Sequence, residues 1–131
     1  MTPFEYLKKN EKKRMSELFE LLSYPSVSAK PEHKKDMIAC AGWLAAHLKK
    51  IGFKSKVYPT KGHPLVYAEY KADKNAPTVL YYGHYDVQPP EPLNLWKTEP
   101  FKPVIRSGYM YARGAVDDKG QTDRKSVVVG R

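Results

Sequence analysis

Apolar side chains recur at helical spacing through the first part of the chain. Between Phe4 and Leu22 they follow one another at steps of three or four residues, with one polar interruption at Glu11. Such a stripe is typical of a helix that buries one face. Tyr24-Pro25 ends it, because a residue that precedes proline avoids the helical conformation. We therefore expect a helix over residues 4–22 that packs on a core.

A second helical stripe begins near Pro31, a residue that suits the first turn of a helix. Its apolar positions recur at a four-three spacing: Met37, Ala41, Leu44, Leu48 and Ile51. Gly52 follows as the expected C-terminal cap. Cys40 lies on this stripe and is the only cysteine, so it is predicted to be a small core residue.

From Phe53 onward the apolar period changes to two, which predicts strands at residues 53–58 and 65–70. The continuous β-prone run that begins at Thr78 predicts a buried central strand over residues 78–84. Residues 104–112 predict a hairpin with a two-residue turn. The pattern as a whole indicates an α/β fold, with two N-terminal helices followed by a mixed sheet.

Length and composition describe one globular unit. The chain has 131 residues, 41% hydrophobic and 28% charged, which is enough for one core and too little for two ordinary domains. A net charge of +9 raises the alternative of a basic, nucleic-acid-binding module. However, no zinc-finger spacing, recognition-helix pattern or Arg/Gly-rich run supports that alternative, so we expect neither a nucleic-acid nor a membrane partner.

The expected location is the cytoplasm. A single cysteine excludes an internal disulfide and favours a reducing compartment. The N-terminus carries no apolar signal core, and no apolar run approaches the length that spans a membrane.

His84 and Asp86 stand where the predicted central strand ends, in the motif Gly83-His84-Tyr85-Asp86-Val87-Gln88-Pro89. In open α/β sheets, ligand sites lie beyond the carboxyl ends of the strands. A neutral imidazole at this place can bind a metal, and a nearby carboxylate can hold its other ring nitrogen. Taken alone, such a pair is more often a hydrogen bond across a loop than a metal site.

A second acidic motif follows in Arg113-Gly114-Ala115-Val116-Asp117-Asp118-Lys119-Gly120, again directly after a strand-like segment. Carboxylate oxygens are ligands for hard and borderline divalent cations. A solvated turn is the alternative for an acidic pair between glycines. The combination of this motif with the His84 motif, 33 residues earlier, favours a metal site.

Together these motifs resemble the dinuclear zinc exopeptidases, which include carnosinase-type dipeptidases, glutamate carboxypeptidase, aminoacylase and acetylornithine deacetylase. The resemblance runs from about Leu18 to Gln121. It also includes Pro92-Leu93-Asn94-Leu95-Trp96, Pro100-Phe101 and Gly108-Tyr109-Met110-Tyr111-Ala112. Gln88-Pro89 and Asp117-Asp118-Lys119-Gly120-Gln121 are most similar to the dipeptidase branch.

The resemblance implies the N-terminal part of a zinc-exopeptidase catalytic domain, with a phosphorylase/hydrolase-like fold. It implies that His84 ligates one zinc ion, that Asp117 bridges two, and that Asp86 takes part in catalysis by orienting His84. Asp118 follows Asp117 across a cis peptide bond and is not expected to be a ligand. Manganese and cobalt remain alternatives to zinc. The family's paired glutamates, including its general base, are not found in this chain.

The expected reaction is hydrolysis of a dipeptide or small amide, with this chain carrying only part of the site and inactive alone. Deacylation of an amide by the same family is the alternative within the enzyme class. The resemblance leaves open a homodimer for the full-length parent. Arg113 and Lys119 are expected to anchor the loop rather than to contact the substrate.

The last residues depart from the resemblance, which stops at Gln121. We expect residues 1–121 to be a partial catalytic domain and residues 122–131 to be a truncated or non-native tail. The apolar run Val127-Val128-Val129 predicts a short strand if the tail is genuine.

Overall fold

The N-terminal helical stripe folds as two helices. The computed structural model describes residues 2–129, in which α1 (Pro3–Lys9) and α2 (Glu11–Ser23) are separated by Asn10. The side-chain amide and the backbone N–H of Asn10 both donate to the carbonyl of Tyr6, at 2.9 and 3.1 Å. This local bonding caps α1, since asparagine competes with the helical hydrogen bonds. The expected helix therefore has the predicted extent, with one break.

The second helix forms as predicted. A short 3-10 turn (Pro31–His33) leads into α3 (Lys34–Lys50), and Gly52 follows in the left-handed region at φ 103°. Cys40 is fully buried, and with Leu21 and Leu44 it makes the centre of the core. Tyr24, Trp43, Val66 and Tyr85 pack around this centre. The core thus joins α2, α3, β2 and the segment that follows residue 84.

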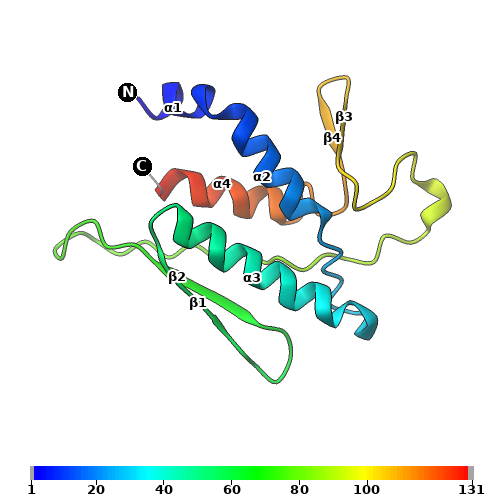
Figure 1. Cartoon of the computed structure of the whole chain (residues 1–131), viewed down its shortest axis with the longest axis horizontal. Coiled ribbons are helices and arrows are strands. Elements are labelled where there is room, and N and C mark those ends of the chain that lie inside the picture. Colours follow the sequence, from blue (N-terminus) through cyan, green and yellow to red (C-terminus); the bar gives the residue numbers. More distant parts are fainter. Residues whose placement is uncertain (1, 130–131) are drawn as a thin grey trace.

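The strands form two separate antiparallel hairpins. β1 (Lys54–Tyr58) pairs with β2 (Leu65–Glu69), and this hairpin packs against α3. β3 (Val104–Arg106) pairs with β4 (Tyr109–Tyr111) around Ser107-Gly108, both of which have positive φ. Figure 1 shows the β1–β2 hairpin beneath α3 and the β3–β4 hairpin projecting at the far side of the molecule. The α/β class is as expected, but the strands are not joined into one mixed sheet.

The predicted central strand over residues 78–84 is wrong. Residues 78–84 form no strand, and the side chains of Val79 and Leu80 are 67% and 88% exposed. A strand needs a neighbour that accepts and donates its backbone hydrogen bonds. Within residues 2–129 the two hairpins pair only with themselves, so this run finds no partner strand.

The C-terminal segment is helical. α4 spans Lys119–Val129. At its start, the Thr122 N–H donates to the carbonyl of Asp118, and the Thr122 hydroxyl donates to the carboxylate of Asp118. It runs beside α2 in Figure 1, and Arg14 pairs with Asp123 across the two helices at 3.5 Å. The alternative of a strand at residues 127–129 is therefore wrong, because a helix already started at its N-terminus outweighs the weak strand preference of valine.

Within residues 2–129, no helix is both long and apolar enough to cross a membrane.

Candidate metal centre

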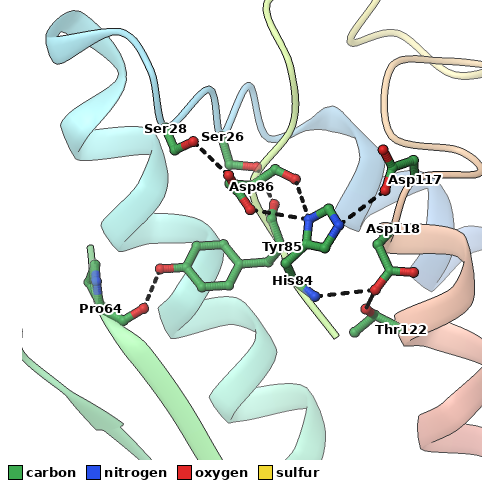
Figure 2. Close-up of polar contacts among 9 residues, drawn as sticks. All are labelled: Ser26, Ser28, Pro64, His84, Tyr85, Asp86, Asp117, Asp118 and Thr122. Atoms are coloured by element: carbon green, nitrogen blue, oxygen red, sulfur yellow. Dashed lines mark hydrogen bonds and ion pairs between the residues drawn. The ribbon is translucent and has the colours of Figure 1, made fainter. Parts of the chain in front are cut away.

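His84 and Asp117 converge in space. His84 Nε2 lies 3.0 Å from Asp117 Oδ1, although 33 residues separate the two in the chain. On the other side of the ring, His84 Nδ1 lies 3.1 Å from Asp86 Oδ1 and 3.1 Å from the Asp86 carbonyl oxygen. Figure 2 shows the imidazole between the two aspartates. Both expected contacts of this histidine are therefore present, one on each ring nitrogen.

The close contact between His84 Nε2 and Asp117 Oδ1 requires a cation between the two atoms. With Nδ1–H donating to Asp86, the Nε2 atom carries the lone pair, and Asp117 Oδ1 is also an acceptor. Two acceptors at 3.0 Å need a proton or a metal ion between them. Zinc binds histidine nitrogen and carboxylate oxygen at about 2.0–2.2 Å. One ion can therefore contact both His84 Nε2 and Asp117 Oδ1, which lie 3.0 Å apart. The donor chemistry and spacing of His84 and Asp117 therefore fit zinc.

The charges around His84 also favour a cation at this place. Partial burial lowers the pKa of His84, but the hydrogen bond to the Asp86 carbonyl and the charges of Asp86, Asp117 and Asp118 raise it by more. The resulting pKa lies above that of a free histidine. The site therefore attracts positive charge, a proton or a metal ion.

Two ligands do not complete a metal site. Zinc takes about four donors, and within residues 2–129 no group of three or more His, Cys, Asp or Glu side chains is arranged to hold an ion. The Asp117 side chain is 80% exposed, so its free face is open to further ligands or to a second ion.

The turn after α2 holds the His84 segment by three hydrogen bonds. The Ser26 hydroxyl donates to the Tyr85 carbonyl at 2.6 Å, and the Val87 N–H donates to the Ser26 carbonyl at 2.9 Å. The Ser28 hydroxyl donates to Asp86 Oδ2 at 2.6 Å, so the two oxygens of that carboxylate are divided between Ser28 and His84. Sequence reasoning missed both serines. They lie 58 and 59 residues from their partners and belong to no motif.

Asp118 belongs to the scaffold of the site. The peptide bond between Asp117 and Asp118 is cis, as predicted. Asp118 Oδ2 accepts the backbone N–H of His84 at 3.2 Å and the Thr122 hydroxyl at 3.2 Å. Its carboxylate thus ties the two ligand-bearing segments together.

Lys119 is completely buried. Its Nζ donates to the carbonyls of Leu21 at 3.1 Å and Tyr24 at 2.7 Å, at the C-terminal end of α2. Burial lowers the pKa of this ammonium group to about 8. The expected anchoring role of Lys119 is confirmed by these contacts.

A cavity of about 300 Å³ opens beside Asp117. Gln88, Trp96 and the segment 110–117 line it. Arg113 forms one wall, where its guanidinium lies 5.3 Å from the centre of the Trp96 ring. Its size suits a small molecule.

Comparison with known proteins identifies the class. Residues 80–122, which include the motifs at His84 and Asp117, match the model of peptidase family M20/M25/M40. The chain is 35% identical over 112 residues to the cysteinylglycine-S-conjugate dipeptidase of Corynebacterium striatum, covering 85% of this chain and 25% of the relative. It is 37% identical to the succinyl-diaminopimelate desuccinylase of Bordetella pertussis, covering 70% and 24%.

The fold agrees with the same class. The structure of the dipeptidase Dug1p from Saccharomyces cerevisiae superposes with a TM-score of 0.87 at 30% identity, over 97% of this chain and 29% of that protein. The resemblance to the metal-dependent exopeptidases is thereby confirmed. The chain spans about a quarter of the length of the curated relatives that it matches.

Proposed function

We propose that this chain supplies part of a dinuclear zinc centre to a protein that hydrolyses dipeptides. The observation that carries the proposal is the contact of His84 Nε2 with Asp117 Oδ1 at 3.0 Å, with Asp86 on the opposite ring nitrogen. His84 would hold one ion through Nε2, and Asp117 would bridge to a second through its exposed face. Bound zinc supplies a Lewis acid and a hydroxide source near neutral pH.

The residues of this chain then have distinct tasks. Asp86 keeps the proton of His84 on Nδ1, and so leaves Nε2 free to bind. Ser28 holds Asp86 in place, and Asp118 ties the Asp117 segment to the His84 backbone. The cavity beside Asp117 gives a dipeptide room next to the ligands.

Zinc binding by the 131-residue chain tests this proposal directly. Cobalt absorption and zinc calorimetry should show weak binding of one ion in the wild type, through His84 and Asp117 with water as the remaining donors, and His84→Ala should abolish it. His33→Ala is the matched control, because His33 also contacts an aspartate, Asp36 at 2.7 Å, but at the start of α3 and away from the site. Binding that survives in His84→Ala and disappears in His33→Ala would contradict the assignment.

The chain alone should not turn over substrate. Its two assigned ligands cannot hold two zinc ions that need about four donors each, and no general base is assigned. Positioned acid–base catalysis is worth roughly 10²–10⁴-fold. With saturating zinc and a panel of dipeptides, the purified chain should therefore hydrolyse no faster than His84→Ala.

Amide deacylation is the second candidate, favoured by the 37% identity to the desuccinylase. The two candidates share the metal centre and differ in substrate. A longer protein that contains this chain should be assayed on dipeptides and on N-succinyl and N-acetyl amino acids. Preference for the acyl substrates would replace the dipeptidase proposal.

The proposed location is the cytoplasm. The single cysteine, buried in the core, suits a reducing compartment.

A further inference from the structure

The Lys119 side chain connects the Asp117 segment to the end of α2. Lys119 is the first residue of α4 and stands two positions after Asp117, yet its Nζ reaches carbonyls 95 and 98 residues earlier in the chain. We propose that Lys119 is a positioning residue that sets where Asp117 and Asp118 stand relative to His84. The functional meaning of this role rests on the proposed metal centre.

The end of α2 offers a suitable anchor. The last carbonyls of a helix have no partner inside the helix and are satisfied by caps, water or side chains. An ammonium group donates several hydrogen bonds and suits the negative end of the helix dipole. Lys119 is completely buried and donates to the carbonyl of Leu21 in the last turn of α2 and to that of the C-cap residue Tyr24, which also accepts the Ser26 N–H at 2.9 Å.

The loop is folded tightly around the stem of Lys119. A Cβ added to Gly114 would lie 3.4 Å from Lys119 Cδ and 2.7 Å from Val87 Cγ1. A Cβ added to Gly120 would lie 2.1 Å from the Ala115 carbonyl oxygen. The segment therefore has little room to move while Lys119 keeps its place.

Two separate sets of hydrogen bonds lead to the same turn. The His84 segment is held through the bonds of Ser26 to Tyr85 and Val87, whereas the Asp117 segment is held through Lys119. The two segments then meet where the His84 N–H donates to Asp118 Oδ2 at 3.2 Å. Removing the Lys119 ammonium should therefore loosen the meeting point and leave the Ser26–Val87 attachment intact.

Hydrogen exchange measured by NMR on the 131-residue chain separates these attachments. In Lys119→Met, which keeps the length of the stem, protection of the His84 amide should fall at least about tenfold, the scale of one hydrogen bond to a charged group. Protection of the Val87 amide should change by less than about twofold. Lys102→Met is the control, because Lys102 pairs with Glu99 at the surface and its side chain is 72% exposed.

The outcomes decide the proposal. An equal loss of protection at His84 and Val87 would make Lys119 a general stabilising residue and overturn the positioning role. Unchanged protection at His84 would overturn it as well. If Lys119→Met does not fold, Lys119→Gln, which keeps a donor and loses the charge, should show a smaller loss with the same selectivity.

Zinc affinity, measured where each variant is folded, gives the second readout. Lys119→Met should bind about tenfold more weakly than Lys102→Met, because Asp117 is no longer held at the distance that suits the ion. Equal affinities would overturn the link to the metal. A wild type that binds no zinc would instead contradict the proposed function, and the exchange data would still decide whether Lys119 positions Asp118.

Discussion

Two neighbouring segments, residues 78–82 and residues 84–88, show that hydrophobicity alone does not decide burial. The first is the most apolar run of the region, yet the side chains of Val79 and Leu80 are 67% and 88% exposed. The second carries a histidine and an aspartate, yet Val87 within it is only 4% exposed. The two segments differ in the parts of the chain that bind them. The turn after α2 binds the second segment by hydrogen bonds, and within residues 2–129 no strand pairs with the first.

The largest expected effect comes from adding one methyl group at Gly120, where the segment after Asp117 is closely packed, unlike the exposed residues 78–82. Gly120→Ala should lower the free energy of unfolding by about 3 kcal/mol, since the new Cβ would lie 2.1 Å from a backbone oxygen. Gly42→Ala is the control, because Gly42 lies in α3 with open space around it. That change should be stabilising by about 1 kcal/mol through helix propensity. Denaturant unfolding of both variants measures the difference, and equal effects would refute the packing argument.

The same contrast can be tested with two valines. Val87→Ala should cost about 2 kcal/mol, the scale for removing a buried valine side chain, whereas Val79→Ala should change stability by less than about 0.5 kcal/mol. The unfolding midpoints in urea give both values. A large loss for Val79→Ala would mean that residues 78–82 are covered in solution.

Asp86 should matter to the metal more than to the fold. Asp86→Ala removes the partner of His84 Nδ1 and should weaken zinc binding about 10- to 100-fold. Ser28→Ala leaves Asp86 in place without its hydroxyl donor and should weaken binding less. Zinc titration of the three proteins checks this order. Unchanged affinity in Asp86→Ala would reduce this residue to a loop-folding role.

The smallest expected effect is a pH dependence at His47. This side chain is 7% exposed and stacked on Trp43, and burial lowers its pKa despite the opposing charge of Glu17 and Asp123. Arg14 and Lys50 lower the pKa further. A histidine with a depressed folded-state pKa loses stability as the pH falls through the unfolded value of about 6.5. His47→Gln should therefore lose less stability than the wild type between pH 7 and pH 5 in parallel urea titrations, and parallel curves would contradict the assignment.

Local patterns predicted most of the elements. The apolar period identified both helical regions, the two hairpins and the burial of Cys40, because these features depend on neighbours in the sequence. Residues 78–84 were misjudged because burial of a strand depends on what pairs with it. The helix over residues 119–129 was missed because it starts with hydrogen bonds from Thr122 to Asp118, which valine preferences do not reveal.

Only part of the candidate site was predicted, because only part of it lies in local sequence motifs. The motifs pointed to His84, Asp86 and Asp117, and the predicted contacts among them are present. Ser26 and Ser28 could not be found, because a serine that bonds a carbonyl or carboxylate nearly sixty residues away leaves no local pattern. The buried partners of Lys119 were equally hidden, since they are backbone carbonyls at the end of another helix.

The loop that joins the His84 segment to the Asp117 segment should tolerate inserted residues. Its ends are tied down separately, by the Val87–Ser26 bond and by the Arg113 N–H, which donates to the Pro100 carbonyl at 2.8 Å. The stretch Leu93–Leu95 between these ties is exposed, and each doubling of loop length costs only about 0.6 kcal/mol. Extra residues inserted there should leave His84 and Asp117 where they stand. The 33-residue spacing is thus free to vary, and the 3.0 Å separation is what the fold must keep.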